Sequence, residues 1–401
     1  MKFGFTTGSC AAAGSKAAAF MLLTGKEKKE ITITTPKGID FKTEIVDIKR
    51  NENEVSCAVV KDGGDDPDIT TGAHIVSTVR FIDSPSLQAQ AKQSRPSVIV
   101  KGGQGVGKVT KPGLDQKVGN AAINHVPREM IEKEVLEVCR ICDFNGTLEV
   151  EISVPEGEEL AKKTFNPRLG IAGGISILGT SGIVEPMSSQ ALKDTILVEL
   201  RQQKALGQKT AVVAPGNYGL DFMKNTFGFD LDKAVKCSNF IGDTVDMAAE
   251  AGFKKMLLIG HIGKLVKLSG GIMNTHSREG DCRMELLAAA AIKSGCTIET
   301  ARAILDCVST EEGIRKIKEE DELLHSCGRS EAIPEKCGSG VVPPALFQKS
   351  MDYLMERIIF FLEKRAAGRL ETACIVFCNE FGLLAKSANA LKMLEGAKSS
   401  E

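Results

Sequence analysis

Tryptophan is absent from this 401-residue sequence, and tyrosine occurs only twice, so aromatic residues make up 5% of the chain. Proteins that bind nucleic acid use aromatic side chains to stack bases and a basic surface to hold the phosphates. This chain has a formal net charge of −1 at pH 7, so it lacks both properties. The composition therefore argues against a nucleic-acid partner.

Long apolar runs are absent too, and none approaches the roughly 20 residues that a membrane-spanning helix needs. The N-terminus lacks the charged-then-apolar order of a signal peptide. We therefore expect a cytoplasmic protein with no membrane partner.

Cysteine is not scarce, since the chain has 12 cysteines, but without an export signal we expect no disulfide framework. The close pairs Cys139/Cys142 and Cys374/Cys378 lie in helical and strand patterns. A zinc ribbon needs its close pairs on tight knuckle turns. We therefore expect buried thiols and no metal site.

The pattern of apolar residues changes along the chain, whose length allows two domains. After an Ala-rich helical stretch, residues 31–35 and 55–61 alternate apolar and polar side chains, as half-buried antiparallel strands do. Further on, apolar strands alternate with amphipathic helices, which is typical of a mainly parallel sheet. The strand patterns there cover residues 210–214, 235–239, 255–259 and 373–377. We predict an α+β domain over residues 1–160, followed by an α/β, Rossmann-like domain over residues 168–401.

A glycine-rich loop in the first half has the spacing of a phosphate-binding loop at Gly102, Gly107 and Lys108. Val109 stands where that motif needs Ser or Thr, and Pro112 prevents the helix that should follow. The sequence thus argues against a nucleoside-triphosphate site. A ligand loop with bare N–H groups and a tight structural turn stay open as alternatives.

Four carboxylates crowd the loop from Asp62 to Asp68, with Asp65 and Asp66 at its centre. Crowded carboxylates raise one another's pKa, so such a loop can supply a general base. It can also bind a divalent cation, although it lacks the spacing of a calcium loop. A solvated turn is the simpler alternative.

Hydroxyl residues stand at the start of the Ala-rich helix, at Thr6, Thr7 and Ser9. A side-chain oxygen there can cap the helix, and the free N–H groups of the first turn can hold an anion. The sequence does not separate a plain capped helix from an anion site.

Three strand patterns in the second half end in glycine-rich turns, at residues 214–219, 237–243 and 259–263. The ends of parallel strands gather at the carboxyl edge of a sheet, where ligands bind. Glycine also ends strands for steric reasons, but three such turns together favour a ligand crevice.

A dense polar segment at residues 270–279 contains His276 beside Asn274, Thr275 and Arg278. This histidine, like His261, can titrate near neutral pH. A lone histidine is more often structural, but packing alone does not explain so many polar neighbours. The segment therefore favours a site.

Taken together, these segments resemble the cobalt-precorrin-5B C1-methyltransferase family. The matching pieces occur in order from residue 3 to at least residue 285, and the C-terminal hundred residues are less distinctive. They are residues 5–13, 62–68, 105–114, 122–124, 127–128, 173–188 and 260–283. This chain has Ala121, His125 and Ile262 where the family commonly has proline, so His125 is a poor catalytic candidate.

The resemblance implies methyl transfer from S-adenosylmethionine to ring carbon C1 of cobalt-precorrin-5B, giving cobalt-precorrin-6A in anaerobic cobalamin biosynthesis. A sulfonium methyl is already activated, so the transfer needs mainly alignment and partial desolvation. No nucleophilic triad or protein-bound metal is required, because the cobalt arrives with the corrinoid substrate.

The resemblance also suggests roles for particular residues. By analogy with nucleotide sites at sheet edges, we place S-adenosylmethionine near Gly216, Asn217, Gly219, Asp243 and Gly260. The corrinoid carries several carboxylates, which basic side chains and exposed N–H groups can receive. We expect it to contact Thr6, Thr7, Ser9, Gly105, Lys108, Arg128, Lys264 and Arg278. The candidates for a general base, if one is needed, are Asp65, Asp66 and His276.

Two other functions stay open at this stage. One is a small-molecule kinase that uses the Gly102–Lys108 loop, and the other is a non-catalytic tetrapyrrole-binding protein. The sequence does not fix the oligomeric state, a homo-oligomer being one possibility, nor does it fix the order in which ligands bind.

Overall fold

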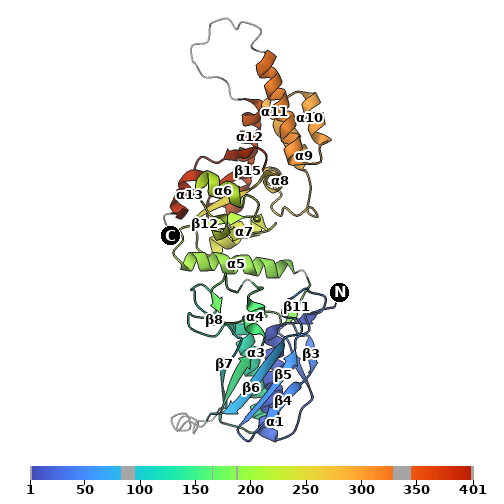
Figure 1. Ribbon diagram of the computed structural model, residues 1–401, viewed down its shortest axis with the longest axis vertical. Helices are drawn as coiled ribbons and strands as arrows, with labels where there is room; N and C mark the ends of the chain where they lie inside the picture. Colours follow the sequence, from blue (N-terminus) through green and yellow to red (C-terminus); the bar gives the residue numbers. More distant parts are fainter. Residues whose placement is uncertain (1, 83–94, 165, 187, 328–344, 399–401) are drawn as a thin grey trace. The chain divides into compact units, whose positions relative to one another are not determined.

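The computed structural model describes residues 2–82, 95–164, 166–186, 188–327 and 345–398. The chain divides into two compact units, residues 1–189 (unit 1) and residues 190–401 (unit 2). Figure 1 draws unit 1 from blue to green and unit 2 from green to red. Each unit has a hydrophobic core of its own. No helix in the described residues is long and apolar enough to span a bilayer.

Unit 1 is built on a five-stranded sheet in the order β4-β5-β6-β9-β7. Neighbouring strands are antiparallel except β7 and β9, which are parallel. The strands are β4 (Val46–Arg50), β5 (Glu54–Val60), β6 (His74–Phe81), β7 (Ser97–Gly102) and β9 (Thr147–Ser153). The unit also contains a hairpin, formed by β2 (Glu30–Thr34) and β3 (Asp40–Glu44), and a short helix, α4 (Gly157–Ala161). It is completed by four two-residue strands: β1 (Gly4–Phe5), β8 (Lys108–Val109), β10 (Ile171–Ala172) and β11 (Ile183–Val184).

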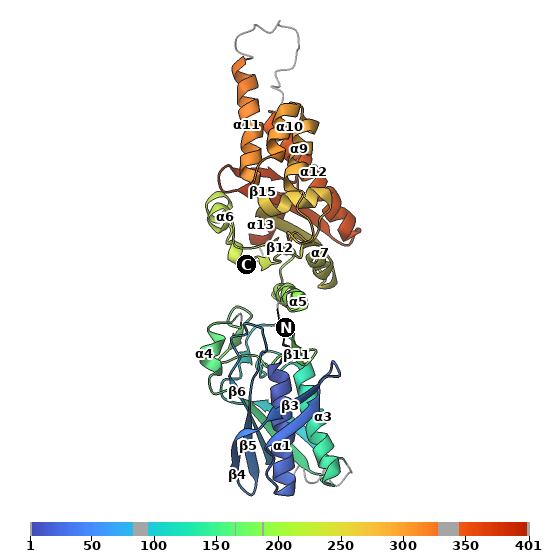
Figure 2. The same cartoon turned by 90° about the vertical axis from the view of Figure 1, so that its right-hand side faces the viewer.

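Two helices, α1 (Thr7–Thr24) and α3 (His125–Ile141), pack against each other and against this sheet (Figure 2). The alanines of α1 are fully buried because small side chains let the helix lie close to both neighbours. A Cβ added at Gly14 would lie 2.8 Å from the Ser77 Oγ, so this approach leaves no room for a larger residue. The Ala-rich pattern thus reflects a helix that is buried on most of its surface.

Residues 168–186 belong to unit 1, although the sequence pattern placed them with the second domain. Strand β10 pairs with β8, and β11 pairs with β1. Between these strands, the Gly107 N–H donates to the Ile175 carbonyl, and the Ile175 N–H donates to the Gly105 carbonyl. The segment has no helical or strand periodicity because its backbone groups pair with loops. Whether each unit is an independent folding domain stays a prediction.

Unit 2 contains a second five-stranded sheet, in the order β13-β12-β14-β15-β16. The first four strands are parallel, and β16 is antiparallel to β15. The strands are β12 (Thr210–Ala214), β13 (Val235–Lys236), β14 (Lys255–His261), β15 (Glu371–Cys378) and β16 (Gly382–Lys386). The predicted mixed α/β architecture is therefore confirmed.

Helices cover both faces of this sheet, so alternate residues of β12, β14 and β15 enter two separate cores. One face carries α5 (Ser189–Ala205), α7 (Ile241–Glu250), α8 (Ile262–Leu265), α9 (Arg283–Ser294), α10 (Ile298–Leu305), α11 (Thr310–Cys327) and α12 (Leu346–Ala366). The other face carries α6 (Leu220–Phe227) and α13 (Ala390–Lys398). Short 3₁₀ turns at Leu231–Lys233 and Val266–Gly270 connect the elements. Burial on both faces explains why these strands are apolar throughout.

The strand order of unit 2 reverses direction at one point. After β12 the chain adds β13 on one side of it, and β14 then pairs on its other side. The connection that leaves β12 and the connection that enters β14 therefore run to opposite sides. This divergence leaves a crevice at the carboxyl ends of these two strands.

Candidate functional site

A cavity of about 390 Å³ lies in unit 2 at this reversal point. Its walls come from the turn after β12, from the end of β14 with the start of α8, and from the N-terminal ends of α9 and α11 with the loop after β15. The lining residues are Pro215, Gly216, Tyr218, Ile259, Gly260, His261, Gly263, Lys264, Arg283, Ser309, Thr310, Glu311 and Asn379. The crevice predicted from the glycine-rich turns thus has a counterpart at the ends of β12 and β14.

Two glycines allow the strand ends to come this close. A Cβ added at Gly260 would lie 3.0 Å from the Leu265 Cδ1 and 3.2 Å from the Pro215 Cδ, so a side chain there would push these neighbours by a few tenths of an ångström. Gly219 has a φ of 91°, and an added Cβ would lie 2.1 Å from the Phe377 ring. Gly219 therefore requires glycine, and Gly260 keeps β14 tightly packed against the turn after β12.

His261 and Glu311 lie next to each other in the cavity wall. The His261 Nδ1 accepts a hydrogen bond from the Gly263 N–H at 3.1 Å, so the Nε2 carries the proton of the neutral ring. The Nε2 lies 2.9 Å from the Glu311 Oε1. It is buried, and among the described residues it has no partner with the angles of a hydrogen bond. The two groups are therefore in contact without being aligned to each other.

Burial lowers the pKa of His261 below its usual value of 6.5, although the negative charge of Glu311 opposes this shift. The imidazole is therefore neutral at physiological pH. On the other side of the carboxylate, the Thr310 Oγ1 donates to the Glu311 Oε2 at 3.0 Å. A neutral imidazole thus provides no positive charge to pair with the Glu311 carboxylate.

Two cationic side chains line the same cavity. The Lys264 Nζ donates to the Pro215 carbonyl at 3.3 Å, and burial lowers the pKa of Lys264. The Arg283 guanidinium binds both oxygens of Asp281, at 2.6 and 2.8 Å. The Tyr218 ring, 71% exposed, stands at the mouth with its centre 6.3 Å from that of the His261 ring. The lining thus offers one carboxylate, two cations and a flat aromatic surface.

The cofactor residues predicted from the sequence divide into two groups. Gly216 and Gly260 line the cavity, and Asn217 and Gly219 lie in the same turn after β12. Asp243 is not among the lining residues, because it lies in α7, where its carboxylate accepts from the Lys193 Nζ at 3.0 Å. Their proposed contacts with a ligand stay predictions.

Sequence reasoning did not assign the cavity's acidic residue. Glu311 lies in the first turn of α11, 50 positions after His261 along the chain. The Ser309 Oγ accepts from the Glu312 N–H at 3.2 Å, which caps this helix. That capping pattern can be read in the sequence and predicts a helix start. It does not indicate that the helix start lies against the end of β14.

The polar segment around His276 is held by a buried lysine. Lys267 is only 4% exposed, and its Nζ donates to the Gly280 carbonyl at 2.8 Å and to the Thr275 carbonyl at 3.3 Å. His276 and Arg278 are exposed on this anchored segment and are not among the residues that line the cavity. Of the predicted substrate residues, Lys264 is the one in unit 2 that lies in the cavity wall.

The glycine-rich loop of unit 1 is not a phosphate-binding loop. The N–H groups of Gly103, Val106 and Gly107 donate to carbonyls within the protein, so they are not turned towards a ligand. The loop leads into β8 instead of a helix, and Lys108 is exposed in that strand. A Cβ added at Gly105 would lie 1.8 Å from the Val154 carbonyl oxygen, which explains the glycine. The kinase hypothesis therefore loses the feature on which it was based.

The hydroxyls at the start of α1 are engaged inside unit 1. The Thr6 Oγ1 accepts from the Ser9 N–H at 3.2 Å and caps the helix. The Thr7 Oγ1 accepts from the Leu178 N–H at 3.0 Å, and the Ser9 Oγ donates to the Gly182 carbonyl at 2.6 Å. These contacts favour the capped helix over the anion site.

Arg128 is also used within unit 1. Its Nε donates to the Ile123 carbonyl and one of its terminal nitrogens to the Val100 carbonyl, both at 2.9 Å. Burial lowers the pKa of Arg128, with the nearby carboxylates opposing this shift. The side chain therefore ties α3 to β7, and its role towards a substrate stays a prediction.

The acidic loop contains two lysine–aspartate pairs. The Asp68 carboxylate accepts from the Lys61 Nζ at 2.5 Å, and the Lys61 side chain is 1% exposed. The Asp62 carboxylate accepts from the exposed Lys2 Nζ at 2.6 Å, while the Asp65 carboxylate accepts from the Lys2 backbone N–H at 2.7 Å. The loop is thus tied to the N-terminus and to β5, and the role of Asp65 and Asp66 as bases stays a prediction.

Replacing Asp68 should destabilise unit 1 in a pH-dependent way. Burial alone would raise the pKa of Asp68, but hydrogen bonds from Lys61 and Thr70 outweigh it and lower the pKa. We expect Asp68→Asn to reduce the unfolding free energy by about 1–2 kcal/mol at pH 7, a value discounted for partial exposure. The ion pair stabilises fully above the ordinary pKa of about 4, and this contribution is lost as the pH falls through the lowered pKa of the folded state.

Urea unfolding at several pH values measures this difference. Asp62→Asn is the matched control, because Asp62 and Lys2 are 55% and 68% exposed and should contribute little. A loss for Asp68→Asn that is equal at pH 7 and at pH 2.5 would contradict the ion-pair explanation.

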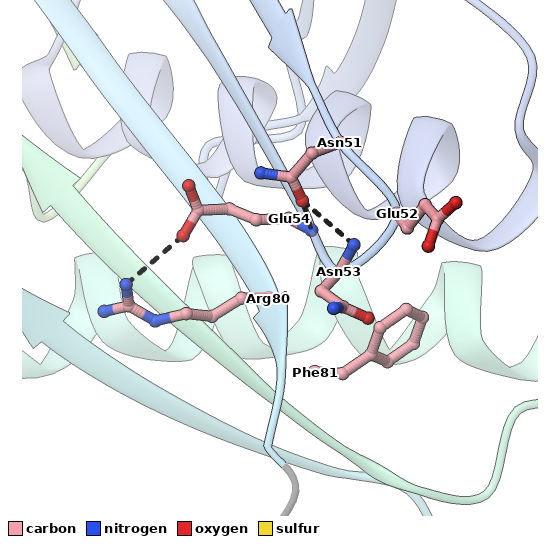
Figure 3. A pocket seen from close by; sticks show the side chains of 6 residues that line it. All are labelled: Asn51, Glu52, Asn53, Glu54, Arg80 and Phe81. Carbon is pink, nitrogen blue, oxygen red and sulfur yellow. Dashed lines mark hydrogen bonds and ion pairs between the residues drawn. The ribbon is translucent and has the colours of Figure 1, made fainter.

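A second hollow, of about 560 Å³, lies at the turn between β4 and β5 (Figure 3). It is lined by Asn51, Glu52, Asn53, Glu54, Arg80 and Phe81. The Asn51 Oδ1 accepts from the N–H groups of Asn53 and Glu54, which closes the turn. Arg80 pairs with Glu54, Glu149 and Glu151. The Asn51 and Arg80 side chains are thus engaged within the protein, and the hollow lies on the surface of the β4–β5 hairpin.

Comparison with known proteins gives a consistent result. The family model described as CbiD matches residues 1–186, and the model described as CbiD, C-terminal domain, matches residues 274–388. A relative from Ruminiclostridium cellulolyticum is 49% identical over 312 residues, which cover 78% of this chain and 78% of the relative. One from Alkaliphilus metalliredigens is 42% identical over 399 residues, which cover 100% of this chain and 96% of the relative. Both relatives are named cobalt-precorrin-5B C(1)-methyltransferase.

A solved structure, the cobalamin biosynthesis protein (cbiD) from Archaeoglobus fulgidus, is also similar. It is 25% identical, and the match covers 69% of this chain and 82% of that chain with a TM-score of 0.35.

Proposed function

Because the chain belongs to the CbiD family, we propose that it methylates carbon C1 of cobalt-precorrin-5B, with S-adenosylmethionine as the methyl donor. The observation that carries this proposal is the match to a relative of that name along the whole chain, at 42% identity over 399 residues. A conclusion about the reaction therefore does not depend on one motif or one unit.

We place the methyl donor in the cavity of unit 2, because the lining suits a charged nucleoside. A volume of about 390 Å³ falls within the range of small-ligand pockets. Glu311 can accept hydrogen bonds, and Lys264 and Arg283 can attract a carboxylate. The donor would supply a methyl group that its sulfonium has already activated.

The protein's contribution is then alignment and removal of water. The apolar surfaces of Pro215, Ile259 and Tyr218 exclude water from one side of the cavity, and the glycine-rich strand ends keep its walls close together. The exposed His276 and Arg278 lie on a segment that Lys267 fixes, which suits contact with a large carboxylate-rich ring. Assignment of the corrinoid contacts and of any base, including Asp65, Asp66 and His276, remains part of the proposal.

The competing hypotheses predict different ligands. A kinase would bind ATP with magnesium, and the N–H groups of Gly103, Val106 and Gly107, which donate within the protein, argue against this. A non-catalytic tetrapyrrole-binding protein would bind the corrinoid without S-adenosylmethionine. Calorimetric titration of the purified protein with each ligand separates the three hypotheses.

The decisive experiment is an anaerobic assay with methyl-labelled S-adenosylmethionine and cobalt-precorrin-5B. We expect one labelled methyl group at C1 of the product, located by NMR. The Clostridioides difficile relative, which carries the same name and is 40% identical over 390 residues, serves as the reference enzyme. Failure to label C1 under conditions in which the reference succeeds would overturn the proposal.

A further inference from the structure

Glu311 is the only carboxylate among the described residues that line the cavity. An ionised carboxylate only accepts hydrogen bonds, so a ligand that contacts it has to present donors. Its Oε2 accepts one bond from the Thr310 Oγ1, and its Oε1 lies beside the His261 Nε2 without hydrogen-bond alignment. Each oxygen can accept about two bonds, so both keep acceptor sites for a ligand.

The position of Glu311 at the sheet edge resembles the acidic position of nucleotide sites. In such sites, an Asp or Glu about 20 residues after the glycine-rich turn accepts from a ribose hydroxyl. Here the corresponding chain, residues 235–239, carries Lys236, Cys237 and Ser238 but no carboxylate. The next acid along, Asp243, is paired with Lys193. The end of β13 therefore does not supply the acceptor, whereas α11 brings one to the cavity.

The charge of the lining argues against the sulfonium as the partner of Glu311. Lys264 lines the same cavity together with Arg283, which Asp281 already pairs, so the lining offers a sulfonium no surplus of negative charge. A sulfonium has no hydrogen to donate, whereas a ribose presents two neighbouring hydroxyls that match the two oxygens of a carboxylate. Hydroxyl recognition is thus the better use of this group.

We propose that Glu311 accepts hydrogen bonds from the ribose hydroxyls of the methyl donor and that His261 is a positioning residue for it. This inference rests on the proposed function, because it assumes that S-adenosylmethionine occupies the cavity. The His261 ring is fixed by the Gly263 N–H and packs edge-on against Phe377, with ring centres 5.8 Å apart. The fixed ring limits the positions that the Glu311 Oε1 can take.

The first test compares Glu311→Gln with a control on the same helix, Glu319→Gln. Glu319 makes an exposed pair with Lys316 at 2.9 Å, away from the cavity lining. Calorimetry on the full chain is run with S-adenosylmethionine, S-adenosylhomocysteine and the 2′,3′-dideoxy analogue of the latter. We expect Glu311→Gln to lower the affinity for S-adenosylmethionine and for S-adenosylhomocysteine by a similar factor, roughly tenfold or more. The control should stay within about twofold of the wild type.

The dideoxy analogue lacks both ribose hydroxyls, so it measures their contribution to the affinity. It should bind the wild type more weakly than S-adenosylhomocysteine, and Glu311→Gln should remove most of this difference. A loss confined to S-adenosylmethionine would show that Glu311 senses the sulfonium and would overturn the inference. Unchanged affinities in a variant with a wild-type thermal transition would overturn it as well. If the wild type binds neither natural ligand, the proposed function itself fails, and the wild-type titration alone shows this.

The second test separates two roles of His261: positioning Glu311, and accepting the hydrogen bond from the Gly263 N–H at the start of α8. In His261→Asn the amide oxygen can still accept from the Gly263 N–H, but the contact with Glu311 is lost. The titratable groups around His261 are Glu311, Tyr218, Lys264, Arg283 and Cys378. Wild-type affinity for S-adenosylhomocysteine should fall as the pH drops through the lowered pKa of His261, because a protonated His261 competes for the carboxylate.

We expect His261→Asn to bind about threefold more weakly at pH 7.5 and to lose this decline at low pH. A pH profile in His261→Asn that matches the wild type would show that His261 acts only as a cap and would overturn its positioning role.

Discussion

Gly105→Ala should destabilise unit 1 by about 3 kcal/mol or more, since it combines a left-handed backbone with overpacking. Gly105 has a φ of 71°, where a Cβ is strained, and the added Cβ would lie 1.8 Å from the Val154 carbonyl oxygen. That oxygen belongs to the backbone and cannot rotate away. The loop would have to separate from residues 154–157 and give up its pairing with Ile175.

Gly119→Ala is the matched control for Gly105→Ala. Gly119 also has a positive φ, of 91°, but no atom lies within 4 Å of an added Cβ. Its cost should be about 1–2 kcal/mol, from the backbone conformation alone. Urea unfolding followed by circular dichroism measures both variants. Equal stability of the two variants, together with weaker ligand binding by Gly105→Ala, would instead favour a ligand-binding loop.

Gly219→Ala should damage the cavity of unit 2 and lower S-adenosylmethionine affinity by roughly 30-fold or more, equivalent to about 2 kcal/mol. Gly219 has a φ of 91°, and the added Cβ would lie 2.1 Å from the Phe377 ring. That ring packs against His261 and is fully buried, so it can move only by displacing its neighbours. The turn that carries Tyr218 should therefore shift outwards.

Gly228→Ala, at the other end of α6, is the control for this effect. Gly228 has a φ of 60° but no neighbour within 4 Å of an added Cβ. It should lose stability without losing affinity. Calorimetry gives the affinities. Tyrosine fluorescence reports changes in unit 2, which contains both tyrosines, Tyr218 in the turn and Tyr353 in α12. Equal affinities for the two variants would show that the Gly219 turn does not shape the binding site.

The strands β12, β14 and β15 could be predicted from the sequence because they are buried on both faces, whereas the strand predicted over residues 235–239 is limited to Val235–Lys236. Residues 210–214 match β12, and the apolar runs at 255–259 and 373–377 lie within β14 and β15. A strand buried on both faces reads as a continuous apolar run, which is a strong local signal. The strand β16 was not predicted, because only part of its length is buried.

The glycine-rich segments show the limit of such prediction. Gly105 and Gly260 both follow apolar runs in the sequence, yet one packs against a backbone carbonyl and the other borders a cavity. What separates them is the tertiary neighbour of each glycine, which depends on parts of the chain about 50 residues away, such as Val154 for Gly105 and Pro215 for Gly260.

The same limit applies to the candidate site. The turn after β12 was predicted because glycine marks the end of a parallel strand. Glu311 was not, because it reaches the cavity through packing of α11 against α8 and α9. The polar segment around His276 was predicted as a site on its composition, and Lys267, which anchors it, looks like any lysine in the sequence.

The pairing of β1 with β11 joins the first and last strands of unit 1. During synthesis, β1 can therefore form its strand pair only after residue 184 has left the ribosome, although the Phe5 N–H can already donate to the Asp62 carbonyl and the strands β4, β5 and β6 can already pair. Closing this long loop is the entropically slow step of the unit. The same pairing brings the two ends of the unit together, so a circular permutant needs only a short linker.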